Sequence, residues 1–263
     1  MKNHLLLTAA VIAGIISLVC GGCAKEYSAS GYTKPVVKED SFNLILHFRP
    51  VADTEDLHFD SSYQNFWKES FSVSAFKFYI CRVDLINTDS SRVYHLNPDK
   101  YFLVDAADST TWDVKLLASP FTYNRISFMI GVDSTGTLKA PHTGALDPAK
   151  GMFIDTATGY VLARLQGRGA GNSFDYSITG FRGVNSALRK PTLLFPFGQT
   201  LQITNTPNQK SKLEISANVN AWFYNPHQVK IKQTPTCTSP GLLAKDISEN
   251  YSGMFAVDTV INH

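Results

Sequence analysis

The sequence lacks an excess of charge of either sign. Its 263 residues carry 24 Lys and Arg against 22 Asp and Glu, which gives a net charge of +2. No basic run or arginine-rich stripe is present either. Because contacts with phosphate supply much of the affinity for nucleic acid, such proteins usually show a concentrated positive face. We therefore do not expect nucleic acid as a partner.

Familiar enzyme signatures are also missing. The sequence contains neither Gly-x-Ser-x-Gly nor His-Glu-x-x-His, which mark common hydrolases. The glycine-rich stretch 167–171 opens no predicted helix that would attract a phosphate, so we interpret it as a flexible hairpin loop. No nucleophile with a base and no acid–base pair stands out. We predict that the protein is not an enzyme.

Histidine is scarce and scattered. Beyond residue 40 the histidines are His47, His58, His95, His142, His227 and His263. No two of them stand two, three or four positions apart, so no local metal chelate is encoded, although ligands can converge from distant strands. His47 alternates away from its apolar neighbours, which favours exposure or a site on the opposite face.

Cysteine is limited to four residues, and two of them lie close to the N-terminus. Only Cys81 and Cys237 remain in the rest of the chain, far apart in the sequence. Two alternatives stay open for them. They form a disulfide in an oxidising compartment, or they are two separately buried thiols.

The sequence has one long hydrophobic run, Leu5–Val19, which follows Lys2 and His4. A helix of this length, rising ~1.5 Å per residue, spans about 22 Å, which is less than the ~30 Å hydrocarbon core of a bilayer. The basic start and the short apolar run are typical of a signal peptide. A permanent transmembrane helix is the weaker interpretation.

The hydrophobic run ends in a Cys-Gly-Gly-Cys sequence. A lipoprotein signal peptidase requires small residues before the cysteine that receives lipid, and the two glycines supply them for Cys23. Cys20 follows bulky Leu18 and Val19 instead. A redox or zinc role for the Cys-x-x-Cys is disfavoured, because no second pair and no βαβ pattern follow. We predict a signal peptide over residues 1–22 and lipid on Cys23.

Lipid on Cys23 implies a location in the bacterial cell envelope. More than one acyl chain gives stable anchoring, and bacterial lipoproteins carry several. Residues 23–40 are rich in Ser, Gly, Thr, Lys and Pro, which suits a flexible tether. We expect an outer-membrane lipoprotein that faces the periplasm or the cell surface.

The remaining residues, 41–263, are predicted to form one all-β domain. Short segments of alternating apolar and polar residues recur between clusters of turn residues, as in a sandwich or barrel. The predicted strands cover 43–48, 74–86, 101–105, 111–117, 125–132, 159–166, 174–180, 200–204 and 212–220. Segment 74–86 is partly apolar on both faces, which indicates a central strand with a bulge.

One short helix is predicted near the C-terminus. Ser239 is placed to cap it, Pro240 fits its first turn, and Gly253 is placed to end it. No internal repeat and no linker divides residues 41–263.

Residues 144–153 (GALDPAKGMF) followed by 158–161 (TGYV) are the most specific motif of the chain. They resemble the central motif of the MbnP-like family, periplasmic proteins named for a copper-binding member. Further matches run in order at 78–80, 101–105, 126–133, 165–167, 174–176 with Gly180, and 250–255. The resemblance implies an antiparallel β-sandwich in the periplasm or at the cell surface. It also implies copper binding through histidines and, in some members, an oxidised tryptophan.

The chain departs from the family pattern where that pattern holds metal-binding side chains. Ile154 and Thr156 stand where many relatives have tryptophan, and Ser177 stands where they have histidine. None of the three is a copper ligand. Two hypotheses follow. In the first, copper binds elsewhere, through ligands drawn from His47, His58, His142, His227, Met152 and Met254. In the second, the fold is kept without the metal, and the domain binds a small ligand, a glycan or a protein.

Replacement of Cys23 by serine is expected to release the protein from the membrane fraction, because the acyl chains are then absent. Fractionation of cells and labelling with a palmitate analogue measure this. Cys20→Ser is the matched control and is expected to stay anchored. A Cys23→Ser protein that still sediments with membranes contradicts the assignment.

Overall fold

The computed structural model describes residues 42–206 and 208–263. The predicted signal peptide, the lipid on Cys23 and the tether over 23–40 lie outside the described residues. Within the described part, no helix combines the length and apolar character needed to cross a membrane.

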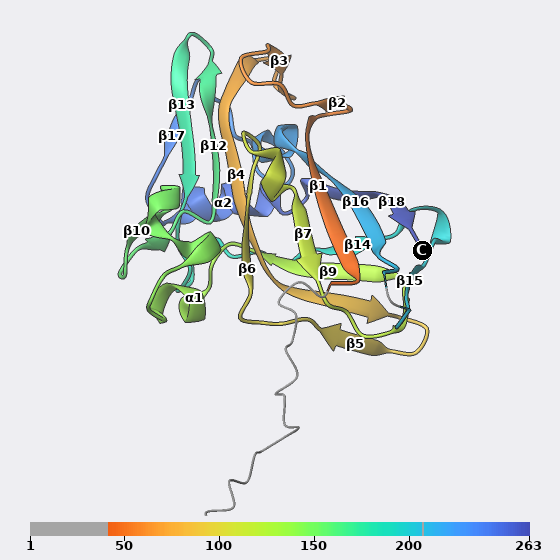
Figure 1. Ribbon diagram of the computed structural model, residues 1–263. Helices are drawn as coiled ribbons and strands as arrows, with labels where there is room; N and C mark the ends of the chain where they lie inside the picture. The colour runs from red at the N-terminus through yellow and green to blue at the C-terminus, as the bar shows by residue number, and fades with distance from the viewer. Residues whose placement is uncertain (1–41, 207) are drawn as a thin grey trace, which may run out of the picture. The chain divides into compact units, whose positions relative to one another are not determined.

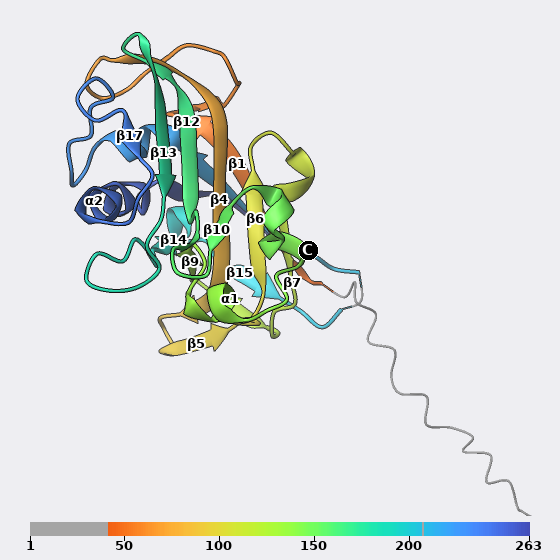
Figure 2. The same cartoon turned by 90° about the vertical axis from the view of Figure 1, so that its left-hand side faces the viewer.

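The strands gather mainly into two sheets (Figures 1 and 2). The smaller has the order β18–β16–β1–β2, with β7 also paired to β1. Its strands are β1 (Leu44–Ala52), β2 (Glu55–Asp56), β7 (Asp113–Leu116), β16 (Ser211–Asn218) and β18 (Phe255–Ile261).

The larger sheet has the order β14–β9–β4–β12–β13–β17, with β3, β5 and β6 also paired to β4. Its strands are β3 (Tyr63–Gln64), β4 (Ser70–Asn87), β5 (Arg92–His95), β6 (Tyr101–Asp105), β9 (Arg125–Ile130), β12 (Ala163–Gly169), β13 (Asn172–Ile178), β14 (Thr192–Leu194) and β17 (Thr236–Cys237). Two further pairs are β8 (Phe121–Tyr123) with β15 (Leu201–Ile203) and β10 (Phe153–Asp155) with β11 (Gly159–Tyr160).

The all-β prediction is confirmed, and most strand pairs are antiparallel as expected. The pair β1–β16 is parallel, however, and so is β13–β17. In β1 the predicted alternation holds, because Leu44, Leu46 and Phe48 are fully buried. The strand continues to Ala52, four residues beyond the predicted end at Phe48.

Strand β4 is the longest element, with 18 residues, and it pairs with β3, β5, β6, β9 and β12. The predicted bulge is present. The register with β9 shifts between Cys81 and Asp84, and Arg82 has a φ of 47°. At Tyr79 the backbone N–H donates to Leu162 (3.1 Å), and the carbonyl accepts from Gly131 (3.0 Å). This residue therefore marks the point where β4 leaves β12 and joins β9.

A cluster of four phenylalanine rings fills the space between the two sheets. Phe48 of β1 lies 5.6 Å from Phe78 of β4 and 5.7 Å from both Phe128 of β9 and Phe255 of β18, measured between ring centroids. All three contacts are edge-to-face, the favoured geometry for aromatic pairs. The cluster joins strands from both sheets into one core.

The predicted C-terminal helix is present as α2 (Leu242–Tyr251), but its predicted cap is wrong. The helix begins at Leu242, three residues after Ser239, so Ser239 is too far away to cap it. The N-cap residue is Gly241, and it makes no side-chain hydrogen bond. Another short helix, α1 (Ser134–Leu138), follows β9 where the strand had been predicted to run on to Val132. Gly131, with a φ of 113°, turns the chain out of the sheet at that point.

The glycine-rich stretch 167–171 is a hairpin, as predicted, but most of it is strand. Only Ala170 and Gly171 form the turn, with φ values of 52° and 86°, as in the two-residue turns that suit hairpin twist. Gly167 lies so close to the carbonyl of Ser72 that a Cβ atom would clash with it. The glycines therefore serve close strand packing and a tight turn.

Phe78→Ala is expected to destabilise the domain by roughly 3–5 kcal/mol, because the substitution leaves a cavity between the sheets. The control Leu117→Ala removes a side chain that is 64% exposed and should change the free energy of unfolding by less than about 0.5 kcal/mol. Urea denaturation followed by tryptophan fluorescence measures both. Equal effects of the two substitutions would disprove the central role of the ring cluster.

Candidate functional site

The family motif folds into a compact surface segment, residues 144–160, which we call the signature segment. It consists of 3₁₀ turns at Gly144–Leu146 and Pro148–Lys150, followed by the β10–β11 hairpin. The Asp147 carboxylate accepts a hydrogen bond from the Ala149 N–H (2.9 Å) and so caps the second turn.

Two buried tyrosines hold the signature segment: Tyr79 of β4 ties it to the larger sheet, and Tyr160 joins its two ends to each other. The Tyr79 hydroxyl donates to the Ala145 carbonyl (3.0 Å), and the Tyr160 hydroxyl donates to the Leu146 carbonyl (2.6 Å). Both side chains are fully buried. Burial raises the pKa of Tyr160 to about 12 and that of Tyr79 still further, so both hydroxyls stay protonated donors. The sequence did not identify these roles, since a donor tyrosine and a packing tyrosine look alike in an apolar strand.

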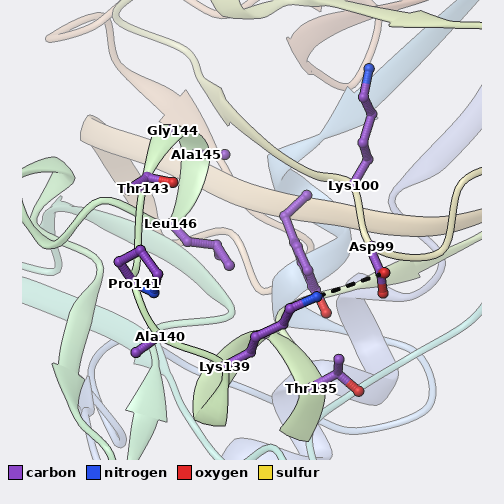
Figure 3. A pocket seen from close by; sticks show the side chains of 12 residues that line it. Asp99, Lys100, Thr135, Lys139, Ala140, Pro141, Thr143, Gly144, Ala145 and Leu146 are labelled. Carbon is purple, nitrogen blue, oxygen red and sulfur yellow. Dashed lines mark ion pairs between the residues drawn. The ribbon is translucent and has the colours of Figure 1, made fainter. Parts of the chain in front are cut away.

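A hollow of about 410 Å³ lies between the signature segment, α1 and the start of β6 (Figure 3). Its apolar surface comes from Ala140, Pro141 and Leu146, together with the ring of Tyr101. A second hollow of about 440 Å³ adjoins it and shares Tyr101, Gly144 and Ala145. Their sizes lie in the range of small-ligand sites.

The charges around the two hollows are mixed in sign. Lys139 pairs with Asp99 at 3.9 Å, as Figure 3 shows, and Lys77 pairs with Asp105 at 2.7 Å. Lys100 also lines the first hollow but forms no ion pair with the described residues, and in Figure 3 it extends away from the Leu146 side. This lining suits a small polar molecule that has an apolar part.

The floor of the first hollow is held in place by Asp133. The Tyr101 hydroxyl donates to this carboxylate (2.7 Å), and Gly136 and Arg82 donate to it as well. Burial alone would raise the pKa of Asp133, but these three hydrogen bonds outweigh burial and hold the pKa below its usual value. The carboxylate therefore remains charged at neutral pH and keeps the Tyr101 ring in place.

The histidines are dispersed over the domain, and three of the four predicted histidine ligands, His47, His142 and His227, already contact protein oxygen atoms. His47 contacts Asp113 (2.7 Å), His95 contacts Asp84 (2.7 Å), and His142 contacts the Thr137 carbonyl (3.1 Å). His227 contacts Glu249 (2.6 Å), and His58 and His263 are exposed. His142 packs against the signature segment, 4.8 Å from the ring of Phe153. His47 is half-exposed, as predicted from its place in the strand.

His227, Asp246 and Glu249 form the one group of three or more His, Cys, Asp or Glu residues, within residues 42–206 and 208–263, whose ligand atoms all lie within 4.8 Å. Arg189 and Lys245 both contact Glu249 at 3.3 Å. Glu249 therefore already has two permanent cations in contact with it, and these would repel a metal dication. We interpret the group as an ion-pair network that holds the His227 loop on α2.

The sulfur atoms are buried and unsuited to copper. Cys81 and Cys237 are free, which resolves the two open alternatives in favour of separate thiols. Burial raises the pKa of Cys81 to about 12 and that of Cys237 to about 11, so neither is a thiolate at neutral pH. Met152 is fully buried, and Met254 is almost so and accepts a hydrogen bond from an indole N–H (3.3 Å).

The three positions that depart from the family pattern do not fit copper. Ile154 is 47% exposed on β10, and Thr156 is exposed in the following turn. The Ser177 hydroxyl donates to Asp175 (2.6 Å) and accepts from the guanidinium of Arg164 (3.1 Å). A hydroxyl committed to an arginine offers no soft or imidazole donor, and the nearby positive charge opposes a cation.

Both thiols are expected to remain unmodified by iodoacetamide at about pH 8 in the folded protein and to react fully in guanidinium, because burial keeps Cys81 and Cys237 protonated. Intact-mass spectrometry counts the alkylated sites. Rapid alkylation of either thiol in the native state contradicts this arrangement. An intact mass that shows a disulfide between the two cysteines contradicts it as well.

The chain was compared with family models, curated proteins and solved structures. The family model described as MbnP matches residues 41–239. Among solved structures, MbnP from Methylosinus trichosporium matches at 9% sequence identity with a TM-score of 0.48, covering 83% of this chain and 97% of that chain. No curated protein matches. The match of the family model to most of the chain confirms the resemblance predicted from the motif, and the chain belongs to the MbnP family.

Proposed function

We propose that this MbnP-family chain is a lipoprotein of the bacterial envelope that binds a ligand other than copper, and that it is not an enzyme. The observation that carries the proposal is the set of side chains at the family's metal positions. Ile154 and Thr156 offer no copper donor, and Ser177 is hydrogen-bonded to Arg164 and Asp175. Loss of the metal with retention of the fold explains all three positions.

The signature segment supports a binding role. The Tyr79 hydroxyl fixes its position on the larger sheet, and the Tyr160 hydroxyl fixes its internal shape, so the adjoining hollows need little ordering when a ligand enters. Preorganised loops on a rigid scaffold lose less conformational entropy on binding. The hollows are therefore the proposed surface for a small polar ligand.

The envelope location is supported by the N-terminal sequence. The basic start, the run Leu5–Val19 and the small residues before Cys23 together favour export and lipidation. A lipid anchor on Cys23 would hold the domain at the outer membrane, on its periplasmic or surface-facing side. A tether over residues 23–40 would let the domain reach ligands near that membrane.

Copper handling is the second candidate function, and membership of the MbnP family over residues 41–239 favours it. Its ligands would come from histidines outside the family's metal positions. His142 is the first of these to consider, because it packs on the signature segment.

Titration of the untagged mature chain, residues 24–263 with Cys23 removed, is expected to show no stoichiometric site for Cu(I) or Cu(II) tighter than about 1 μM. Competition with chromophoric chelators measures the affinity. One tight site per chain would refute the metal-free proposal. His142→Ala and His95→Ala then serve as a matched pair: loss of the site with His142→Ala alone would assign copper to the signature segment.

A further inference from the structure

An exposed pair of stacked aromatic rings lies at the end of the domain that carries β2 and β3. Phe66 is 59% exposed, and its ring stacks on Tyr224 with centroids 4.6 Å apart and an interplanar angle of 17°. Trp67 meets Phe66 edge-on at 5.1 Å. Figures 1 and 2 place this end of the sheets opposite α1, away from the signature segment.

The stacked pair borders a hollow of about 670 Å³ whose other lining is mostly polar. Both Phe66 and Tyr224 line it, and the remaining side chains include Asp53, Glu55, Gln64, Asn65, Lys68 and Asn220. The two carboxylates outnumber the one ammonium group, so the hollow disfavours an anionic ligand. No His, Cys or Met is among its described lining residues, which makes the hollow independent of the copper question.

Asn220 gives the hollow an unused hydrogen-bond acceptor. Its side chain is 4% exposed, and its Nδ2 donates to the Gln64 carbonyl (3.3 Å). Its Oδ1 is buried and has no hydrogen-bond partner within the described part of the chain. Buried polar atoms nearly always have a partner. Because this oxygen is shielded from solvent, a ligand hydroxyl reaches it only when the Asn220 side chain turns toward the hollow.

Hydrogen bonds fix the turn that carries Phe66. The Trp67 indole N–H donates to the Phe223 carbonyl (2.8 Å) and thereby ties the Phe66 turn to the segment before Tyr224. Asn65 accepts from the backbone N–H groups of Trp67 (2.9 Å) and Glu69 (3.0 Å). Phe66 therefore lies on a turn that hydrogen bonds hold in place, next to the segment that carries Tyr224.

We propose that this hollow is a binding site for a neutral glycan. A sugar presents a face of C–H groups that suits the negative face of an aromatic ring, and Phe66 with Tyr224 supply that surface. Its hydroxyls both donate and accept, which matches the carboxylates and amides around the hollow. A nucleic acid would also stack, but it needs a positive groove, and the lining here is acidic.

The test uses the soluble mature chain, residues 24–263, against an array of neutral oligosaccharides of glucose, xylose, mannose and galactose, followed by titration calorimetry on the best hit. Phe66→Ala and Tyr224→Ala are each expected to weaken binding at least tenfold, since each removes half of the stacking surface. The matched control is Phe197→Ala, which removes a ring that is 99% exposed elsewhere on the domain and should leave the affinity unchanged.

A change in tryptophan fluorescence on adding the oligosaccharide is also expected, because Trp67 contacts Phe66. Thermal unfolding confirms that each variant is folded. Absence of binding to every neutral oligosaccharide overturns the proposal, and so does binding that survives the Phe66→Ala, Tyr224→Ala double substitution. Binding confined to acidic glycans overturns it as well. None of these outcomes depends on the copper titration. The glycan proposal and the metal-free proposal can therefore be disproved independently of each other.

Discussion

The fold depends on the change of partner that strand β4 makes along its length. Its 18 residues pair with five other strands, and the bulge at Arg82 with the hydrogen bonds of Tyr79 lets β4 leave β12 and join β9. A bulge bends a strand and strengthens its twist. Because of that bend, Phe78 of β4 and Phe128 of β9 meet Phe48 from the facing sheet in one ring cluster. Loss of this geometry would separate the larger sheet into two halves without a common core.

The main contacts of the described core use none of the histidine side chains that were predicted as copper ligands, which is consistent with the proposal that the fold persists without the metal. The ring cluster, the parallel β1–β16 pair and the buried tyrosines Tyr79 and Tyr160 hold the core and the signature segment in place. Ile154 and Thr156 lie on the surface of that segment, so their identity affects the core little. Surface positions on a rigid scaffold are free to change, and binding properties change with them.

Much of the fold can be predicted from the sequence because the patterns that specify single strands are local. The strand at 101–105 and the bulge in 74–86 were predicted correctly, since alternation and an apolar run on both faces are visible in a few residues. The parallel pairing of β1 with β16 was not predicted, because periodicity does not specify a partner. Strand β18 was missed as a strand, although Phe255–Ile261 closes the smaller sheet, since its burial depends on β16. The candidate sites are harder still. Phe66 and Tyr224 are brought together only by the tertiary fold, and so are His227 and the carboxylates around it.

The central claim is that the domain is held together by packing and strand pairing without a metal ion. Thermal unfolding of the mature chain in excess chelator and in excess Cu(II) tests it most directly. A ligand present at 100 times its dissociation constant stabilises the folded state by about 2.7 kcal/mol, which would raise the melting temperature by several degrees. We predict the same melting temperature in both solutions. A melting temperature that falls in chelator and is restored by copper would contradict the claim.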